Sequence, residues 1–228
     1  MDGTWIYELG SNHLGRIDII SKTLEYIRQY RSFRYDIVLK LQLFPNLPQY
    51  TDAGNYHVSR ELWIDAVKEA RNFGIPITAS VFDLECLDLL LDVHPGAPFV
   101  KIAYSQKENH VLVKEAASRK HTLVSCDHMS KHRVYSGNNI WHLYCIPMYP
   151  VPFPCCFDDH IFKLFKGFSD HTLGIESTKK AVSHGAKIIE KHVLPPDHTR
   201  YNITCPDSTF SITARDFMRC VAKCQPSL

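Results

Sequence analysis

The sequence predicts a single α/β domain, a (β/α)8 TIM barrel that spans residues 1–228. Short runs of β-branched or apolar residues alternate with segments of helical periodicity, which is typical of a parallel sheet with crossover helices. There are eight such runs, and closure into a barrel is the economical arrangement of eight parallel strands in a chain of this length. No repeat, low-complexity tract or linker divides the chain, so we expect one domain.

The strands are predicted from the runs themselves. They cover residues 4–9, 35–43, 75–82, 99–103, 122–126, 140–146, 167–169 and 187–193. The seventh run is the least strand-like in composition, and its assignment rests on its place in the alternation.

Helical periodicity predicts helices over residues 17–30, 59–73, 84–91, 109–119, 175–184 and 213–223. The second of them opens with a Ser59 cap and ends at Gly74. Its expected apolar stripe comprises Leu62, Ile64, Ala66 and Val67. The crossovers after strands five and six are predicted to be shortened, because residues 129–139 are few and polar and residues 149–166 leave room for only a short helix.

Composition argues against several classes of function. The net charge is +2 with neutral histidines, which gives no general attraction to nucleic acid or to membrane surfaces. No apolar run approaches the roughly 20 residues that span a bilayer, and the first ten residues lack the pattern of a signal peptide. We therefore expect a cytoplasmic protein. Its eight cysteines show no CxxC pair and no zinc spacing, so we expect reduced thiols.

Polar side chains fall where the predicted strands end, which is the face on which TIM barrels carry their active sites. Glu8 ends the first strand, and Lys40 and Lys101 lie inside apolar runs. Lysine is almost never buried without a partner. The two lysines therefore point outward, pair with a carboxylate such as Glu8, or hold a dianionic ligand together with nearby hydroxyls.

Two histidines are candidates for a metal site. His171 and His192 lie 21 residues apart, one strand–helix–strand unit, so we expect them at the ends of neighbouring strands. Imidazoles suit Mn, Fe, Co or Zn, and two protein ligands leave positions open for water or substrate. The alternative is a pair of hydrogen-bonded core histidines. His13 is either a third member of the group or a loop residue.

Several motifs resemble one family. Residues 167–174 read GFSDHTLG and residues 181–192 read AVSHGAKIIEKH, which together resemble strands seven and eight of the N-acetylneuraminate (sialic acid) synthases. The PDH at residues 196–198, the opening ELGSNHLG at 8–15, VLKLQ at 38–42 and YPVP at 149–152 match that family in the same order. The resemblance runs from about residue 5 to residue 197 and covers the barrel domain only, without the family's usual C-terminal antifreeze-like domain.

The resemblance implies a reaction and a set of roles. Members of that family condense phosphoenolpyruvate with N-acetylmannosamine or a related sugar and use a divalent metal, of which Mn²⁺ is the most expected and Mg²⁺ or Co²⁺ are alternatives. It implies metal ligands at His171 and His192, and catalytic roles for Glu8, Lys40 and Lys101. Phosphoenolpyruvate contacts would be Lys40, Ser80, Lys101, Ser125 and Ser169. Sugar contacts would be Gln42, Phe82, Tyr149 and Asp197. The resemblance leaves a homodimer open as the assembly.

The sequence also departs from that family's pattern. Tyr104 stands where a phosphate-contacting serine is usual, Gln106 replaces an acidic residue, and Pro147 removes an amide or hydroxyl contact. Asn55 is a candidate substitute for a sugar contact in the shortened loop after strand two. Three hypotheses remain: a synthase acting on an N-acylated aldose, a degenerate barrel that binds ligand as a regulatory subunit, and a different metal-dependent lyase or hydrolase on the same scaffold.

Overall fold

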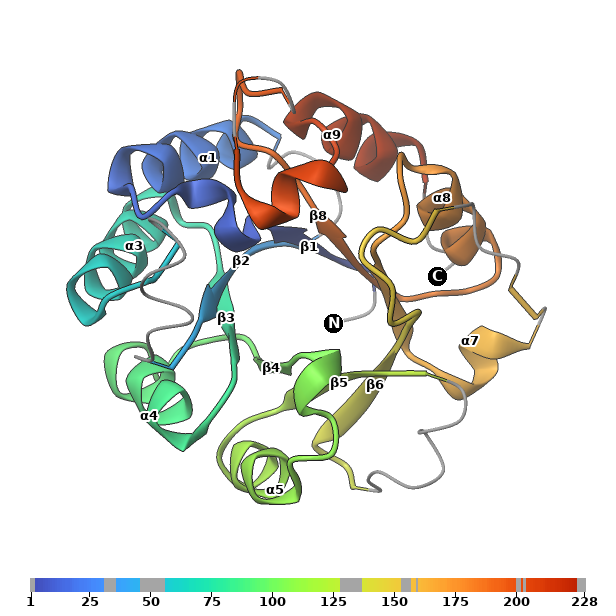
Figure 1. Ribbon diagram of the computed structural model, residues 1–228, viewed down its shortest axis with the longest axis horizontal. Helices are drawn as coiled ribbons and strands as arrows, with labels where there is room; N and C mark the ends of the chain where they lie inside the picture. Colours follow the sequence, from blue (N-terminus) through green and yellow to red (C-terminus); the bar gives the residue numbers. More distant parts are fainter. Residues whose placement is uncertain are drawn as a thin grey trace.

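Eight parallel strands close into a barrel, and helices surround it, in the computed structural model of the chain (Figure 1). The structure describes residues 3–30, 36–45, 56–127, 137–152, 157–158, 160–199, 202 and 204–224. Neighbours in the sheet follow the chain order, and β8 pairs with β1 to close the ring. The predicted TIM barrel is therefore confirmed.

Each strand overlaps one of the predicted runs. The strands are β1 (Thr4–Glu8), β2 (Ile37–Leu43), β3 (Ile77–Val81), β4 (Val100–Ile102), β5 (Thr122–Cys126), β6 (Ile140–Cys145), β7 (Gly167–Asp170) and β8 (Ile188–His192). The weakest prediction, β7, has a steric reason for its composition. A Cβ on Gly167 would lie 2.0 Å from the carbonyl oxygen of Ile188, so glycine is needed where these two strands meet.

The α-helices are α1 (Ile17–Gln29), α3 (Arg60–Phe73), α4 (Leu84–Val93), α5 (His110–Arg119), α7 (Ile161–Leu164), α8 (Glu176–Ser183) and α9 (Ala214–Lys223). Short 3-10 helices are η1 (Gly10–His13), η2 (Tyr104–Gln106) and η3 (Pro206–Thr209). The expected short helix after strand six is α7. The crossover after strand five lies mostly at residues 128–136, outside the described part of the chain.

The caps predicted for α3 are present, but its predicted stripe is partly wrong. The Ser59 hydroxyl accepts the Leu62 amide at 3.2 Å, and Gly74 adopts a left-handed φ of 65°. The buried face comprises Trp63, Ala66, Val67 and Ala70, whereas Leu62 and Ile64 are only partly buried. The i, i+3, i+4, i+7 spacing from residue 63 describes this face better than the spacing from residue 62.

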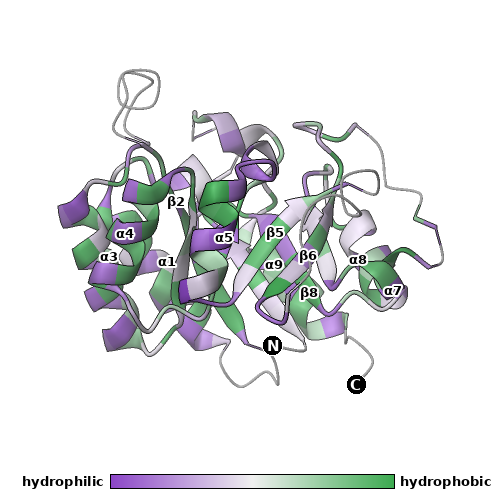
Figure 2. Ribbon diagram, turned by 90° about the horizontal axis from the view of Figure 1, so that it is seen from below, coloured by the Kyte–Doolittle hydropathy of each residue, from purple (hydrophilic) through white to green (hydrophobic). Residues whose placement is uncertain are grey.

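The core has two parts. Most buried apolar residues pack between the outside of the sheet and the helices, and Figure 2 shows hydrophilic residues on the outer faces of α3 and α4. A second, smaller cluster brings together side chains from strands all around the ring, so it fills the barrel interior. We call this cluster the apolar floor; it comprises Ile6, Val38, Phe99, Leu123, Leu143 and Ile188.

The residues two positions beyond the floor face the same interior, because side chains alternate along a strand. This second level is polar and buried, and we call it the inner polar layer: Glu8, Lys40, Lys101, Ser125, Cys145 and Glu190. The fold thus carries charged groups into the barrel toward the carboxyl ends of the strands. Among the described residues, no helix is long and apolar enough to cross a membrane.

Candidate active site

Two lysines and two carboxylates meet in the inner polar layer. The ammonium of Lys40 contacts the carboxylate of Glu8, lies 3.5 Å from Oε2 of Glu190, and donates to Oγ of Ser80 at 2.7 Å. The ammonium of Lys101 lies 3.5 Å from Oε1 of Glu190. None of the four charged side chains is more than 4% exposed. Both lysines therefore point inward, and they are paired with carboxylates.

Glu190 is a site residue that the sequence interpretation did not single out. Its carboxylate accepts a hydrogen bond from Oγ of Ser169 at 2.6 Å and lies between the two ammonium groups. Burial opposes its ionisation, but the charges of Lys101 and Lys40 hold the pKa of Glu190 well below its usual range. The sequence does contain a sign of its role. Glu190 lies two residues after Ile188 and two before His192, so the three side chains face the same side of the strand.

Glu8 titrates differently from Glu190. Burial raises the pKa of Glu8 to about 8, and the attraction of Lys40 offsets only part of that cost. Burial lowers the pKa of Lys40, but the charge of Glu190 and the contact of the ammonium with the Glu8 carboxyl outweigh burial and raise it. Glu190 is therefore the ionised partner of the lysines, and Glu8 holds a proton near neutral pH. Burial lowers the pKa of Lys101, which has one carboxylate neighbour.

The hydroxyl of Ser125 has no hydrogen-bond partner in the described part of the chain. Its Oγ is buried, and no described residue forms a hydrogen bond with it. A buried hydroxyl without a partner costs free energy, so a group of this kind is well suited to a ligand. Ser80 and Ser169, by contrast, are engaged with Lys40 and Glu190.

His171 and His192 are side by side, as predicted. His171 follows β7, His192 ends β8, and their ring centroids are 5.3 Å apart. Burial lowers the pKa of both to about 3, and the charge of Lys40 contributes at His192. His13 lies in η1, and its Nδ1 accepts the amide of Gly15 at 2.9 Å. Both rings of the pair are neutral, which is the form that binds metal ions.

Within the described residues, no group of three or more His, Cys, Asp or Glu side chains is arranged to hold a metal ion. The site therefore offers two protein ligands rather than a closed cage. Nδ1 of His192 is buried without a hydrogen-bond partner among the residues described. Two neutral, adjacent imidazoles with unused ring nitrogens fit a divalent cation that keeps open positions for substrate.

Two aspartates that follow β8 in Pro-Asp pairs lie in different surroundings. Asp197, the predicted sugar contact, is exposed and lies within electrostatic reach of Tyr26 on α1. The carboxylate beside the histidines belongs to Asp207 in η3, 3.7 Å from Nδ1 of His192. It accepts the amide of Ser11 at 2.7 Å. The missed signal was a second Pro-Asp pair at residues 206–207.

Gly10 makes the approach of η1 to η3 feasible. Its φ is 54°, and a Cβ there would lie 2.2 Å from Oδ2 of Asp207 and 3.1 Å from Nδ1 of His192. A side chain at this position would displace one or both groups.

The other predicted sugar contacts lie on the rim. Gln42 is half-buried at the inward position after Lys40, and the ring of Phe82 stacks on Phe44 at 4.4 Å. Tyr149 is 54% exposed, and its ring lies 4.3 Å from that of His171. Phe210, which the sequence interpretation missed, lies edge-on to His192 at 4.7 Å.

The structure shows the surroundings of most of the residues that differ from the family's pattern. The hydroxyl of Tyr104 donates to Asp127 at the end of β5, and the ammonium of Lys107 lies 4.3 Å above the Tyr104 ring. Gln106 accepts a hydrogen bond from Asn109, and Pro147 is exposed. Asn55 lies outside the described residues.

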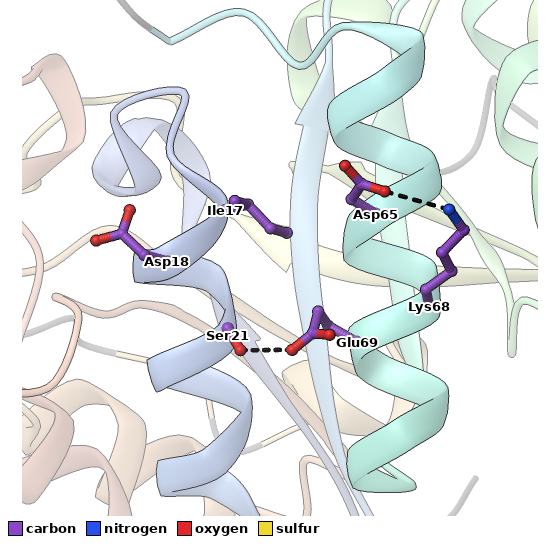
Figure 3. Close-up of a pocket in the computed structure, with 6 residues that line it drawn as sticks. All are labelled: Ile17, Asp18, Ser21, Asp65, Lys68 and Glu69. Carbon is purple, nitrogen blue, oxygen red and sulfur yellow. Dashed lines mark hydrogen bonds and ion pairs between the residues drawn. The ribbon is translucent and has the colours of Figure 1, made fainter.

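A pocket of about 340 Å³ opens on the flank of the barrel, between α1 and α3 (Figure 3). Across it, Ser21 donates to Glu69 at 2.5 Å. Its lining comprises Ile17, Asp18, Ser21, Asp65, Lys68 and Glu69. None of the predicted site residues is among them, so this pocket is separate from the candidate active site.

Comparison with known protein families shows to which family this chain belongs. The model of the NeuB family matches residues 45–227. The chain belongs to the NeuB family. The N,N'-diacetyllegionaminic acid synthase of Campylobacter jejuni is 29% identical over 85% of this chain and 70% of that protein. The N-acetylneuraminate-9-phosphate synthase of Drosophila melanogaster is 26% identical over 59% of this chain and 40% of its own length.

Two solved structures share the fold of this chain. The N-acetylneuraminic acid synthetase of Leptospira borgpetersenii, solved in complex with citrate, superposes with a TM-score of 0.78 at 20% identity, over 96% of this chain and 81% of that one. The spore coat polysaccharide biosynthesis protein spsE of Bacillus subtilis gives a TM-score of 0.76 at 22% identity, over 96% and 66% of the two chains. The sequence relatives named above are synthases of sialic-acid-type sugars.

Proposed function

We propose that this NeuB-family chain condenses phosphoenolpyruvate with an N-acylated aldose such as N-acetylmannosamine. The product would be a sialic-acid-type 2-keto sugar acid, and the reaction would depend on a divalent metal, Mn²⁺ before Mg²⁺ or Co²⁺. The observation that carries the proposal is the inner polar layer, in which two buried ammonium groups lie within electrostatic reach of two neutral imidazoles. The same layer holds the hydroxyl of Ser125, which has no partner among the described residues.

The inner polar layer suits an anionic donor. Phosphoenolpyruvate carries a phosphate and a carboxylate, and Lys40 and Lys101 offer two ammonium groups to hold them. The hydroxyl of Ser125 forms no hydrogen bond with any described residue, and the hydroxyls of Ser80 and Ser169 are bonded to the charged groups. Positioning and electrostatic stabilisation in a buried site are the main contributions that a protein makes to such a reaction.

Glu8 and the two histidines would act at the carbon atoms that react. The Glu8 carboxyl holds a proton near neutral pH, which it can exchange with the carbon skeleton or with attacking water. His171 and His192 would hold the divalent metal, which supplies Lewis-acid polarisation of the sugar carbonyl.

The rim suits the sugar. Gln42 offers an amide, and Phe82 and Tyr149 offer aromatic faces. Asp197 remains a proposed sugar contact, and Asp207 offers a second carboxylate beside His192. We propose a cytoplasmic location, consistent with the absence of disulfides among the described cysteines, and assembly as a homodimer, which size-exclusion chromatography with light scattering would test.

The reaction is tested by phosphate release from phosphoenolpyruvate with Mn²⁺ and a panel of N-acylated hexosamines and pentoses. We expect release with at least one sugar, and its loss in Lys101→Met, which removes one ammonium at similar length. Phosphoenolpyruvate binding by calorimetry without release with any sugar would instead support the binding-subunit hypothesis. Unchanged Mn²⁺ content in both His171→Ala and His192→Ala would refute the metal site.

A further inference from the structure

The thiol of Cys145 is a member of the inner polar layer that the proposed reaction does not use. Cys145 ends β6 and is fully buried. Its Sγ lies 3.6 Å from Nδ1 of His171 and 3.6 Å from the carbonyl oxygen of Ile146, both within hydrogen-bonding range for sulfur. The thiol therefore connects the end of one strand to a histidine on the next.

The Cys145 thiol has one possible acceptor and one imidazole nitrogen within hydrogen-bonding range. A neutral thiol has one proton to donate and sulfur lone pairs that accept. With the S–H directed to the carbonyl of Ile146, the sulfur accepts a hydrogen bond from Nδ1–H of His171.

This arrangement selects one form of the imidazole. A neutral histidine carries one N–H, so a proton on Nδ1 leaves a lone pair on Nε2. The ring of Tyr149 lies 4.3 Å from the His171 ring and limits its rotation. In metal sites, the second nitrogen of a ligating histidine commonly donates to a partner that orients the ring and sets the tautomer.

We propose that Cys145 is a positioning residue, which holds His171 in the Nδ1–H tautomer with Nε2 directed to the divalent metal. This inference rests on the metal site of the proposed function. The thiol meets the imidazole at Nδ1 and not at the proposed ligand atom, Nε2, so it orients the ring without taking a coordination position.

The first test compares metal affinity in three variants. Cys145→Ala removes the hydrogen-bond partner and should weaken Mn²⁺ binding by about 10- to 100-fold, the usual effect of losing an outer-shell partner. Cys145→Ser can still accept from Nδ1–H and donate to Ile146, so it should retain most of the affinity. Cys86→Ala, which removes a buried thiol on α4, is the matched control and should bind as the wild type does. Mn²⁺ affinity is measured by competition with a chromophoric chelator.

Two spectroscopic measurements distinguish a role of Cys145 in positioning His171 from a role as a metal ligand. In metal-free protein labelled with ¹⁵N-histidine, His171 should show the Nδ1–H tautomer, and Cys145→Ala should mix the two tautomers. With Co²⁺ bound, the wild type should lack a thiolate-to-metal charge-transfer band. Such a band, or an unchanged tautomer in Cys145→Ala, would overturn the inference.

The variants also distinguish failure of this inference from failure of the proposed site. Wild-type affinity in Cys145→Ala, together with lost binding in His171→Ala, would reject the positioning role and leave the metal site standing. Wild-type affinity in His171→Ala and His192→Ala would remove the metal site and this inference with it.

Discussion

Every residue of the apolar floor is followed, two positions along its strand, by a member of the inner polar layer. Side-chain alternation makes this spacing a direct consequence of the strand period. Burying two lysines and two glutamates in this layer is expensive even when they pair, and apolar replacements of buried pairs are often neutral or stabilising. The charges therefore make sense as parts of a ligand site rather than as stabilising interactions.

Ser125→Ala tests the unpaired hydroxyl. Because Oγ of Ser125 has no partner among the described residues, its removal should leave the free energy of unfolding unchanged or slightly higher. Phosphoenolpyruvate binding should weaken by about 2- to 10-fold, the value of one hydrogen bond. Calorimetry and urea denaturation measure the two effects. Thr78→Val is the control for stability, because the Thr78 hydroxyl donates to Phe99 at 2.5 Å and its loss should destabilise the fold.

Glu8 predicts a pH dependence of donor binding. Its pKa of about 8 means that Glu8 is neutral below pH 8 and negative above it. The added negative charge beside Lys40 opposes an anionic ligand, so the phosphoenolpyruvate dissociation constant should rise above pH 8, by up to roughly tenfold for each pH unit. In Glu8→Gln this alkaline rise should disappear. An equal rise in both proteins would show that another group titrates.

For single residues, the sequence indicated which side chains belong to the candidate site better than it indicated the residues that they contact. His171 and His192 lie side by side as expected, because strand order decides their neighbours. The orientation of Lys40 and Lys101 was left open, and the structure shows the inward, paired alternative. Glu190 was missed because its role depends on lysines far away in the chain. The position of Asp207 beside His192 was missed as well, because it depends on the path of the loop after β8.

Between elements, the contact of η1 with η3 brings Asp207 to the histidines. Gly10→Ala should break it, because the new Cβ would lie 2.2 Å from Oδ2 of Asp207. We expect a loss in the free energy of unfolding that exceeds that of Gly174→Ala by at least about 1 kcal/mol. Gly174 is the matched control: its φ is also positive, at 72°, but a Cβ there meets nothing within 4 Å. If urea denaturation showed equal losses in the free energy of unfolding for the two variants, backbone strain alone would explain the effect of Gly10→Ala.

Regular elements were predictable because local chemistry specifies them. The caps at Ser59 and Gly74 mark the ends of α3 without reference to the rest of the molecule. The buried face of α3 was offset by one position, since Trp63 was left out of the stripe. The 3-10 helices were not predicted. They are short, and their conformation depends on contacts with distant residues at the rim, such as the hydrogen bond between Ser11 and Asp207.

For the whole molecule, the buried titratable groups predict an optimum of stability near pH 6.5 in metal-free protein. The pKa values of His13, His171 and His192 fall from 6.5 to about 4, 3 and 3 on folding, so their contribution is present above pH 6.5 and is lost as the pH falls. The pKa of Glu8 rises from 4.5 to about 8, so its contribution is lost as the pH rises toward 8.

Between pH 4.5 and 6.5 the three histidines outweigh the one glutamate, and between 6.5 and 8 only Glu8 acts. Urea denaturation across this range measures the curve. Glu8→Gln should flatten its alkaline side, where one proton corresponds to about 1.4 kcal/mol per pH unit. A curve that still declines between pH 6.5 and 8 in Glu8→Gln would assign the decline to a different group.

The pairing of β1 with β8 has a consequence for how the molecule is made. Glu8 on the first strand of the barrel lies in register with His192 on the eighth. On the ribosome, seven strands emerge before Glu190 can neutralise the lysines or the second imidazole can join the first. The proposed site is therefore assembled only when the eighth strand joins the first and the ring is completed.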